Sequence, residues 1–337
     1  MKIPALTVLA VLLALCFSSP VQAKTIRIGL SMPRHMKEID YLNGMFVRFK
    51  EIVERESGGD LKVQMYFGGV LGKPDERLNQ VRRNIIQMSD ASDGNYATIF
   101  RDIQVISIPY LFPNREVAHS VLDGEFGKVL AEKLRIKTNI RVLGWWESAG
   151  FKHYSANKPM RAPGDFHGQK MRVMSAVFSL PVIAMGGSAI PVPMPELYIS
   201  LKTGVVNGQD NAVAVFNMLK LHEVQDYLVL DSHIYSFGPL AINEAFFSTL
   251  SSHEKRIVES AAKTVVKWNR RRSMEQETAA IKKALCHGVK IIHLTHPEKL
   301  ALKNRTQPAA IKWMKNNIDS PNLVDMLIDQ VRTRTTH

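Results

Sequence analysis

The segment His167–Ser175, HGQKMRVMS, places Lys170 and Arg172 two residues apart in an otherwise apolar run typical of a buried strand. A guanidinium is almost never fully buried without a partner. Arg172 therefore requires a carboxylate, which comes either from this chain, for example Asp165 or Glu196, or from a ligand outside it. Its planar set of N–H donors matches a carboxylate in a bidentate arrangement.

Motifs of common catalytic and metal sites do not occur in the sequence. There is no GxSxG, HExxH, P-loop or paired CxxC pattern. His293 and His296 are three residues apart, but a proline follows at once, so surface histidines are favoured over a metal site. We therefore predict no catalytic residue, no metal and no cofactor.

The first 23 residues have the pattern of a secretory signal peptide. Lys2 precedes the apolar stretch 3–17, and Val21-Gln22-Ala23 follows, which predicts cleavage after Ala23 and export. Cys286 is then the sole cysteine, so the mature chain has no intramolecular disulfide. Its length suggests two lobes held by ordinary cores.

The chain is basic, with 44 Lys and Arg against 31 Asp and Glu and a formal net charge of +13. Such a charge favours an anionic ligand, a membrane surface or nucleic acid, or simply keeps the surface soluble. Apart from Asn269–Ser273, NRRRS, the basic residues are scattered and have no interleaved aromatic residues. We therefore predict no nucleic-acid partner.

The elements that must position these side chains follow an α/β pattern. The N-terminal part predicts a strand at 25–33, a helix at 39–60, a strand at 61–67, and a glycine-rich turn at 68–76 into a helix ending near Gln87. This order is typical of a parallel sheet with crossover helices.

The later part of the chain continues this alternation. It predicts strands at 103–113, 141–148, 151–157 and 169–175, a helix from Arg115 to about Arg135, and short helices at 177–185 and 195–202. The longest helical pattern runs from about Ser252 to Leu285, with Ser251 or Ser252 and Glu254 as its N-terminal cap. A helix of this length is suited to bridging two lobes.

The centre of the sequence carries a specific combination of motifs. GDFHGQKMRVMS is followed by GGSAIPVPMPELYISLKTGVVNGQDNAV and HEVQDYLVLDSHIY. This block resembles the periplasmic solute-binding subunit of TRAP transporters, the DctP-type family, with its pattern GxKxR, a Pro-rich turn and ExYxALxxGxVDGxEN. GGVLGKPDE, ISIPYLF and NEAFFSTLSSHEKRIV extend the resemblance over nearly the whole mature chain. Asn207 and Asp210 are conservative departures from the family pattern.

The resemblance implies two α/β lobes, joined by crossing hinge strands and a long lobe-bridging helix, that close over a small organic acid in the periplasm. We expect lobe I to comprise about 24–148 and 237–276, and lobe II about 149–236 and 277–337. The captured acid would be delivered to a small and a large integral membrane TRAP subunit, with no chemistry performed on it.

The resemblance also assigns ligand-binding residues. The family's signature arginine falls on Arg172, and its ligand-contacting asparagine on Asn211, which alternatively caps a turn or helix. Lys152 stands where several members carry a second arginine, and either contacts an anionic or hydroxyl group or points to solvent. Glu76 matches an acidic position near the cleft, or is an exposed acid in the first turn of a helix.

Further candidates follow from position in the fold. Ser92, Asp93 and Asn95 lie after a strand, where α/β sheets place ligand residues. Trp146 forms either an apolar wall of the cleft or part of the core. Met194 replaces an aromatic residue of some members, so stacking on a sugar-like ring is not supported.

The two cationic candidates, Arg172 and Lys152, fit a monoanion or a small dianion. They do not choose between a C4-dicarboxylate, a 2-oxo acid and a sugar acid. Two other functions stay open at this stage. One is a sensor that presents its ligand to a receptor, and the other is an exported enzyme that acts on an organic acid.

Overall fold

The computed structural model describes residues 23–35, 37–174 and 176–335. The predicted signal peptide, apart from its last residue, lies outside the described residues. Within the described part of the chain, no helix combines the length and the apolar character needed to cross a membrane.

Two β-sheets organise the fold. The smaller has the strand order β2-β1-β3 and is parallel, and the larger has the order β6-β5-β7-β4-β8-β9 and is mixed. The strands are β1 (Lys24–Gly29), β2 (Leu61–Tyr66), β3 (Met88–Ser89), β4 (Ile140–Ala156), β5 (Lys170–Val173), β6 (Ser188–Pro191), β7 (Gly208–Asn211), β8 (Tyr227–Asn243) and β9 (Lys290–His293).

Helices surround both sheets. The α-helices are α1 (Asp40–Glu56), α2 (Pro74–Arg82), α3 (Asp93–Tyr96), α4 (Arg115–Asp123), α5 (Glu125–Thr138), α6 (Ala176–Ala184), α7 (Leu197–Lys202), α8 (Val213–Met218), α9 (Glu244–Thr249), α10 (Ser252–Cys286), α11 (His296–Asn317) and α12 (Asn322–Thr335). The 3₁₀ helices are η1 (Lys37–Ile39), η2 (Arg101–Ser107), η3 (Pro163–Phe166), η4 (Met194–Glu196) and η5 (Leu221–Glu223).

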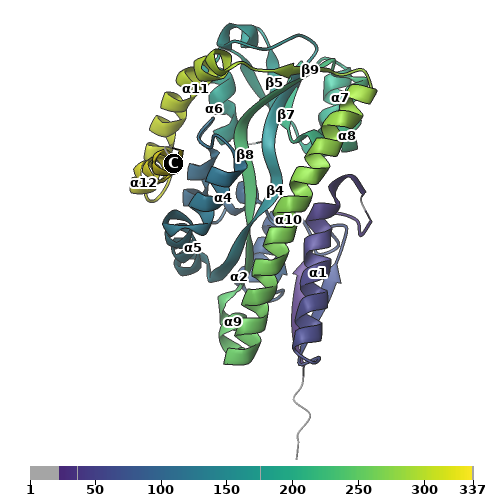
Figure 1. The fold of residues 1–337 in the computed structure, drawn as a ribbon, viewed down its shortest axis with the longest axis vertical. Helices are drawn as coiled ribbons and strands as arrows, with labels where there is room; N and C mark the ends of the chain where they lie inside the picture. The colour runs from purple at the N-terminus through teal and green to yellow at the C-terminus, as the bar shows by residue number, and fades with distance from the viewer. Residues whose placement is uncertain (1–22, 36, 175, 336–337) are drawn as a thin grey trace, which may run out of the picture.

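Strands β4 and β8 are long neighbouring strands of the larger sheet. Each has 17 residues, and they pair antiparallel from Ile140 opposite Asn243 to Ala156 opposite Tyr227. The pairing shifts between Glu147 and Gly150, where Gly150 adopts a φ of 69° that favours glycine. Figure 1 shows the two strands running along the length of the molecule with α10 beside them. The predicted α/β class and crossing strands are confirmed.

Helix α10 forms for reasons visible in its sequence. The Ser251 hydroxyl caps its first turn by accepting a hydrogen bond from the backbone N–H of Glu254 at 3.2 Å. In turn, the Glu254 carboxylate accepts one from the backbone N–H of Ser251 at 2.6 Å. Ile257, Ala261 and Val265 then lie on one buried stripe at helical spacing. The predicted extent of this helix is confirmed to within one residue at its C-terminus.

Several predicted elements were wrong. The predicted strand 103–113 is instead η2 followed by a loop, because Pro109 and the positive φ of 53° at Tyr110 do not fit a strand. The predicted helix from Arg115 divides into α4 and α5 at Gly124, whose backbone is extended. The two predicted strands at 141–148 and 151–157 are one strand, β4.

One further helix boundary moved. The helix expected to reach Gln87 ends at Arg82, and Asn84 follows with a φ of 59°. Helix α12 packs against α4 and α5, which were expected in lobe I, whereas α11 packs against α6 in the expected lobe II. The C-terminal helices thus contact both expected lobes, and the boundaries of the lobes stay a prediction.

Candidate functional site

A cavity of about 210 Å³ lies where loops of the small sheet face the middle of β4 and the C-terminal ends of β5 and β7. Its lining comes from segments far apart in the sequence, including the loops after β1 and β3 and the helices α6 and α8. Six of the predicted site residues line it: Ser92, Asp93, Asn95, Trp146, Lys152 and Asn211. The fold therefore brings together most of the site expected from the sequence.

Arg172, on β5, is not among the residues that line this cavity and is 2% exposed. Its Nε donates to the carbonyl oxygen of Val192 at 2.9 Å, and its buried Nη1 has no hydrogen-bond partner in the described part of the chain. Burial lowers the pKa of the guanidinium, and the nearby carboxylate of Asp210 opposes this. Burial of this charged guanidinium is thus energetically unfavourable, and only part of its hydrogen-bonding capacity is used.

Neither internal partner suggested by the sequence pairs with Arg172 among the described residues. The Asp165 carboxylate instead accepts from the backbone N–H groups of Arg161 at 2.7 Å and Ala162 at 2.8 Å, so it caps η3. Glu196 lies in η4 and makes no ion pair with Arg172 there. The anionic partner of Arg172 is therefore either a ligand from outside the chain or the nearby carboxylate of Asp210.

Lys152 is buried in β4 and already has an anionic partner. Its Nζ lies 3.3 Å from Oδ2 of Asp210 and 3.9 Å from the ring centre of Phe178. Asp210 Oδ2 is also 3.5 Å from Nε2 of His233. Both separations from Asp210 are long for hydrogen bonds, so the attraction is mainly coulombic.

The neighbours of Asp210 set its protonation. Burial alone would raise the pKa of Asp210, but Lys152 and His233 hold it well below its usual range. Burial would lower the pKa of His233, yet Asp231 and Asp210 raise it to about 9. These four groups therefore form a charge-balanced buried network at neutral pH.

Asp93 begins α3 and is 4% exposed. Its Oδ1 accepts from the hydroxyl of Ser236 at 3.2 Å, while its buried Oδ2 has no hydrogen-bond partner in the described chain. Burial raises the pKa of Asp93 to about 6, against the opposing charge of Lys152. Beside it, Ser92 and Asn95 satisfy each other, since the Asn95 amide oxygen accepts from the Ser92 backbone at 3.1 Å and hydroxyl at 3.2 Å.

Trp146 and Asn211 complete the predicted lining. Trp146 packs edge-on against Phe46, with ring centres 6.1 Å apart, and its buried Nε1 has no partner within the described residues. Gly238 permits this position, because a Cβ there would lie 2.8 Å from Nε1. The Asn211 amide nitrogen donates to Gln209 at 2.5 Å. The indole thus serves both the core and the cavity wall.

Glu76 lies outside the cavity lining. It is exposed in the first turn of α2, and its Oε2 accepts from the backbone N–H of Lys73 at 2.8 Å. This is the helix-terminal role that the sequence left open as the alternative.

A second buried arginine was not predicted from the sequence. Arg77, on α2, is 1% exposed and donates to Asp90 at 2.7 Å, to Ser89 at 3.2 Å and to the carbonyl of Gly72 and hydroxyl of Ser31. Its position beside Leu78 and four residues before Val81 on the buried face of the helix was the available signal.

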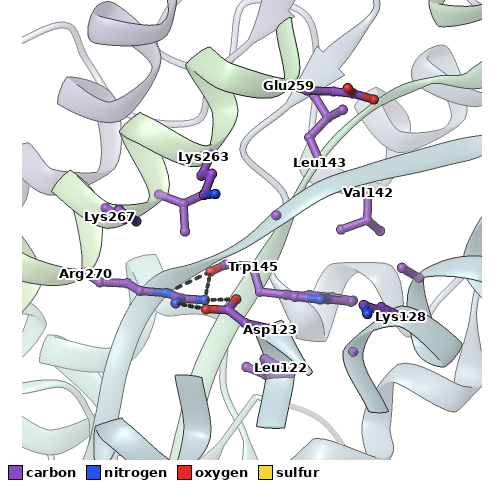
Figure 2. Close-up of a pocket in the computed structure, with 14 residues that line it drawn as sticks. Leu122, Asp123, Lys128, Val142, Leu143, Trp145, Glu259, Lys263, Lys267 and Arg270 are labelled. Atoms are coloured by element: carbon purple, nitrogen blue, oxygen red, sulfur yellow. Dashed lines mark hydrogen bonds and ion pairs between the residues drawn. The ribbon is translucent and has the colours of Figure 1, made fainter. Parts of the chain in front are cut away.

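A separate groove of about 430 Å³ contains none of the predicted residues. It lies between α10, β4 and the α4–α5 pair, and Figure 2 shows Arg270 in contact with both Asp123 and Trp145. The guanidinium donates to the Asp123 carboxylate at 2.7 and 2.8 Å and to the carbonyl oxygen of Trp145 at 2.7 and 3.1 Å. Arg270 is thus satisfied within the protein, unlike Arg172.

Comparison with known proteins identifies the family. The model of the bacterial extracellular solute-binding proteins, family 7 (DctP), matches residues 35–317. The C4-dicarboxylate-binding periplasmic protein DctP of Rhodobacter capsulatus is 32% identical over 255 residues, which cover 75% of this chain and 75% of that protein.

Solved structures agree with this assignment. A TRAP periplasmic solute-binding protein from Ochrobactrum anthropi, with its C-terminus bound in its ligand-binding pocket, is 28% identical with a TM-score of 0.86, covering 94% of this chain and 97% of its own. Another from Sulfitobacter sp. NAS-14.1, with bound β-D-galacturonate, is 28% identical with a TM-score of 0.81, covering 92% and 100%. The chain described here belongs to the DctP family of bacterial extracellular solute-binding proteins.

Proposed function

We propose that this protein is the periplasmic solute-binding subunit of a TRAP-type transporter and that it captures a small organic acid through Arg172. The observation that carries the proposal is the buried Nη1 of Arg172, which lacks a partner in the described chain. A ligand carboxylate would supply the missing acceptors and an opposite charge in one step. In a site shielded from water this pairing is stronger than at the surface.

The route from the cavity to Arg172 follows β5. The strand leads into Met174 and Phe178, which line the cavity, while Asn211 lines it at the end of the adjacent strand β7. We therefore propose that the carboxylate enters between Met174, Phe178 and Asn211.

The lining also supports capture by lobe closure. Ser92 to Asn95 lie at the start of α3, which follows β3 of the small sheet, whereas Met174 and Asn211 lie at the ends of β5 and β7 of the large sheet. A ligand that contacts both groups stabilises the arrangement in which they approach each other. Strands β4 and β8, which run along both regions, are the natural hinge.

The partners and location follow from the family. We propose that the chain is exported after cleavage at Ala23 and delivers its acid to a small and a large integral membrane subunit. Similar proteins carry the name of TRAP periplasmic solute-binding proteins, and this supports the proposal. The ligand leaves this subunit chemically unchanged.

The test is a thermal-shift and calorimetric screen of refolded mature protein against carboxylic acids and neutral sugars. A ligand at a hundred times its Kd stabilises a protein by roughly 2.7 kcal/mol. We expect an acid to bind the wild type and not Arg172→Ala. Lys170→Ala, which removes an exposed cation from the same strand, is the matched control and should bind normally. Equal binding by Arg172→Ala would refute the role of this arginine.

A further inference from the structure

The charges around the cavity form two balanced groups and leave two residues over. Lys152, Asp210, His233 and Asp231 form one network, in which His233 Nδ1 lies 2.9 Å from Asp231. Arg77 and Asp90 form a second, separate pair. Among the described residues, two charged groups near the cavity belong to neither network: Arg172, whose buried Nη1 has no hydrogen-bond partner, and Asp93, whose buried Oδ2 has none. The neutral indole Nε1 of Trp146 in the wall is also without a partner there.

This balance limits the charge of the ligand. Arg172 accommodates one carboxylate, but Lys152 is already neutralised by Asp210 and is not a second free cation. A second ligand carboxylate would also face Asp93, whose like charge repels it. The cavity is therefore built for one carboxylate.

Asp93 demands a different group from the ligand. An ionised carboxylate only accepts hydrogen bonds, and Oδ1 already accepts from Ser236. Oδ2 therefore requires a donor, which is a hydroxyl or an ammonium group. Burial raises the pKa of Asp93 to about 6, so most of these carboxyls are ionised at pH 7.

Apart from the indole N–H of Trp146, the rest of the wall is largely apolar. Met32, Met174, Met194 and Met218 line the cavity together with Phe178 and Leu42. Methionine side chains are flexible and polarisable, and they suit an apolar group of irregular shape.

The remaining polar groups of the wall are largely committed to each other. Ser92 donates to Asn95, and the hydroxyls of Ser148 and Ser236 lie 3.1 Å apart. Ser31 donates to Asp90 at 3.1 Å. A ligand with many hydroxyls would find few free partners on this wall.

Resting on the proposed function, we infer that the ligand is a monocarboxylate with an apolar body and one hydroxyl or ammonium donor directed at Asp93. The charge balance makes a C4-dicarboxylate less favourable, and the small number of free polar groups in the wall does the same for a polyhydroxylated sugar acid. The relatives named for a C4-dicarboxylate and solved with galacturonate represent those two classes, so likeness alone does not choose between them.

The experiment measures Kd by calorimetry for five small organic acids with refolded mature protein. They are leucine, 2-hydroxy-4-methylpentanoate, 4-methylpentanoate, succinate and galacturonate. We expect leucine or the hydroxy acid to bind best, with a loss on the order of tenfold or more when the donor is missing in 4-methylpentanoate. Succinate and galacturonate should bind more weakly still.

Variants of Asp93 test which group reads the donor. In Asp93→Ala the advantage of the hydroxy acid over 4-methylpentanoate should disappear, while binding of 4-methylpentanoate itself persists. Asp93→Asn, which is closer in shape, should lose leucine binding if the alanine variant does not fold. An unchanged preference in both variants would overturn the role of Asp93.

The outcomes separate the inference from the function. Tightest binding of succinate or galacturonate, abolished by Arg172→Ala, would overturn the inferred class and leave the proposed function standing. No binding of any of the five acids, together with no effect of Arg172→Ala in the wider screen, would overturn both.

Discussion

Arg77 and Arg172 are two buried arginines in different surroundings. Arg77 lies beneath the small sheet and donates to a carboxylate, two hydroxyls and a backbone carbonyl. Arg172 lies in the large sheet and donates to one backbone carbonyl, that of Val192, with its Nη1 left without a partner in the described chain. Exposure does not separate them, since they are 1% and 2% exposed.

The comparison shows that burial of a charge does not reveal its role, whereas satisfaction of its donors does. A buried group whose donors all find acceptors within the protein contributes to the folded state. A buried group with an unused donor makes the unliganded state less favourable, and a ligand that supplies the acceptor removes this cost. Arg77 is therefore expected to support folding, and Arg172 to support binding.

The largest expected effect is on stability at the first site. Arg77→Met should lower the free energy of unfolding by about 3–5 kcal/mol, because Asp90 would stay buried without its partner. Urea titration followed by circular dichroism measures this change. Arg82→Met, at an exposed position of the same helix, is the control. If the two variants had similar free energies of unfolding, Arg77 would not be the stabilising residue inferred here.

The same substitution at the second site should act on binding instead. Arg172→Met should weaken binding of the acid by about 2–5 kcal/mol, since its carboxylate would be buried unpaired. The free energy of unfolding without ligand should change by less than about 1 kcal/mol, because one hydrogen bond is lost and a buried charge is removed. Calorimetry and urea titration check the two halves. A stability loss equal to that of Arg77→Met would show that Arg172 is structural.

A smaller effect is expected at Asp93. Its pKa is about 6 in the folded protein against an ordinary 3.8, so the folded state holds this proton more tightly than the unfolded state. Its ionisation therefore destabilises the fold progressively from about pH 4 to pH 6, and the full cost persists above that range. Asp93→Asn should stabilise the unliganded protein by on the order of 2 kcal/mol at pH 7.

The pH dependence sharpens this test. As the pH falls from about 7 to about 4, the difference in stability between the wild type and Asp93→Asn should shrink to a small remainder, because Asp93 becomes protonated in the folded state and increasingly in the unfolded state. Lys152 and Ser236 face Asp93 and are unchanged in the variant. Urea titrations at pH 4 and pH 7 provide the comparison. A constant difference between the variants across this range would contradict the proposed protonation of Asp93.

The smallest effect is expected in the groove of Figure 2. Arg270→Ala removes contacts to Asp123 and Trp145 at a partly open site, so stability should fall by about 1 kcal/mol. Binding of the acid should not change, because the groove shares no lining residue with the cavity. A changed Kd in calorimetry would connect the two regions.

Local signals predicted much of the fold. The cap at Ser251 and the apolar stripe of α10 are both written in consecutive residues, and that helix was placed almost to the residue. The run 103–113 was misassigned because a short apolar stretch looks alike in a strand and in a buried 3₁₀ turn. The break at Gly124 was missed although Asp123-Gly124 is a turn signal, because the apolar residues on either side keep a helical spacing.

For the site, the sequence and the family resemblance supplied most of the cavity lining but not its charge balance. Lys152 was predicted as one of two cationic candidates for the ligand. Its pairing with Asp210 was not predicted, because it depends on strands β4 and β7 lying side by side. The burial of Asp93 beside Ser236, 143 positions away in the chain, was likewise not predicted. Contacts of this kind are tertiary, and no local pattern encodes them.

The long pairing of β4 with β8 also governs how the chain reaches its native state. Ile140 finds its partner only at Asn243, roughly a hundred residues later, so closing this loop costs entropy before the pairing returns any enthalpy. Distant pairings of this kind slow folding. We expect that the large sheet cannot fold completely during synthesis until β8 has been made. The solute-binding site therefore stays incomplete until most of the chain has been synthesised.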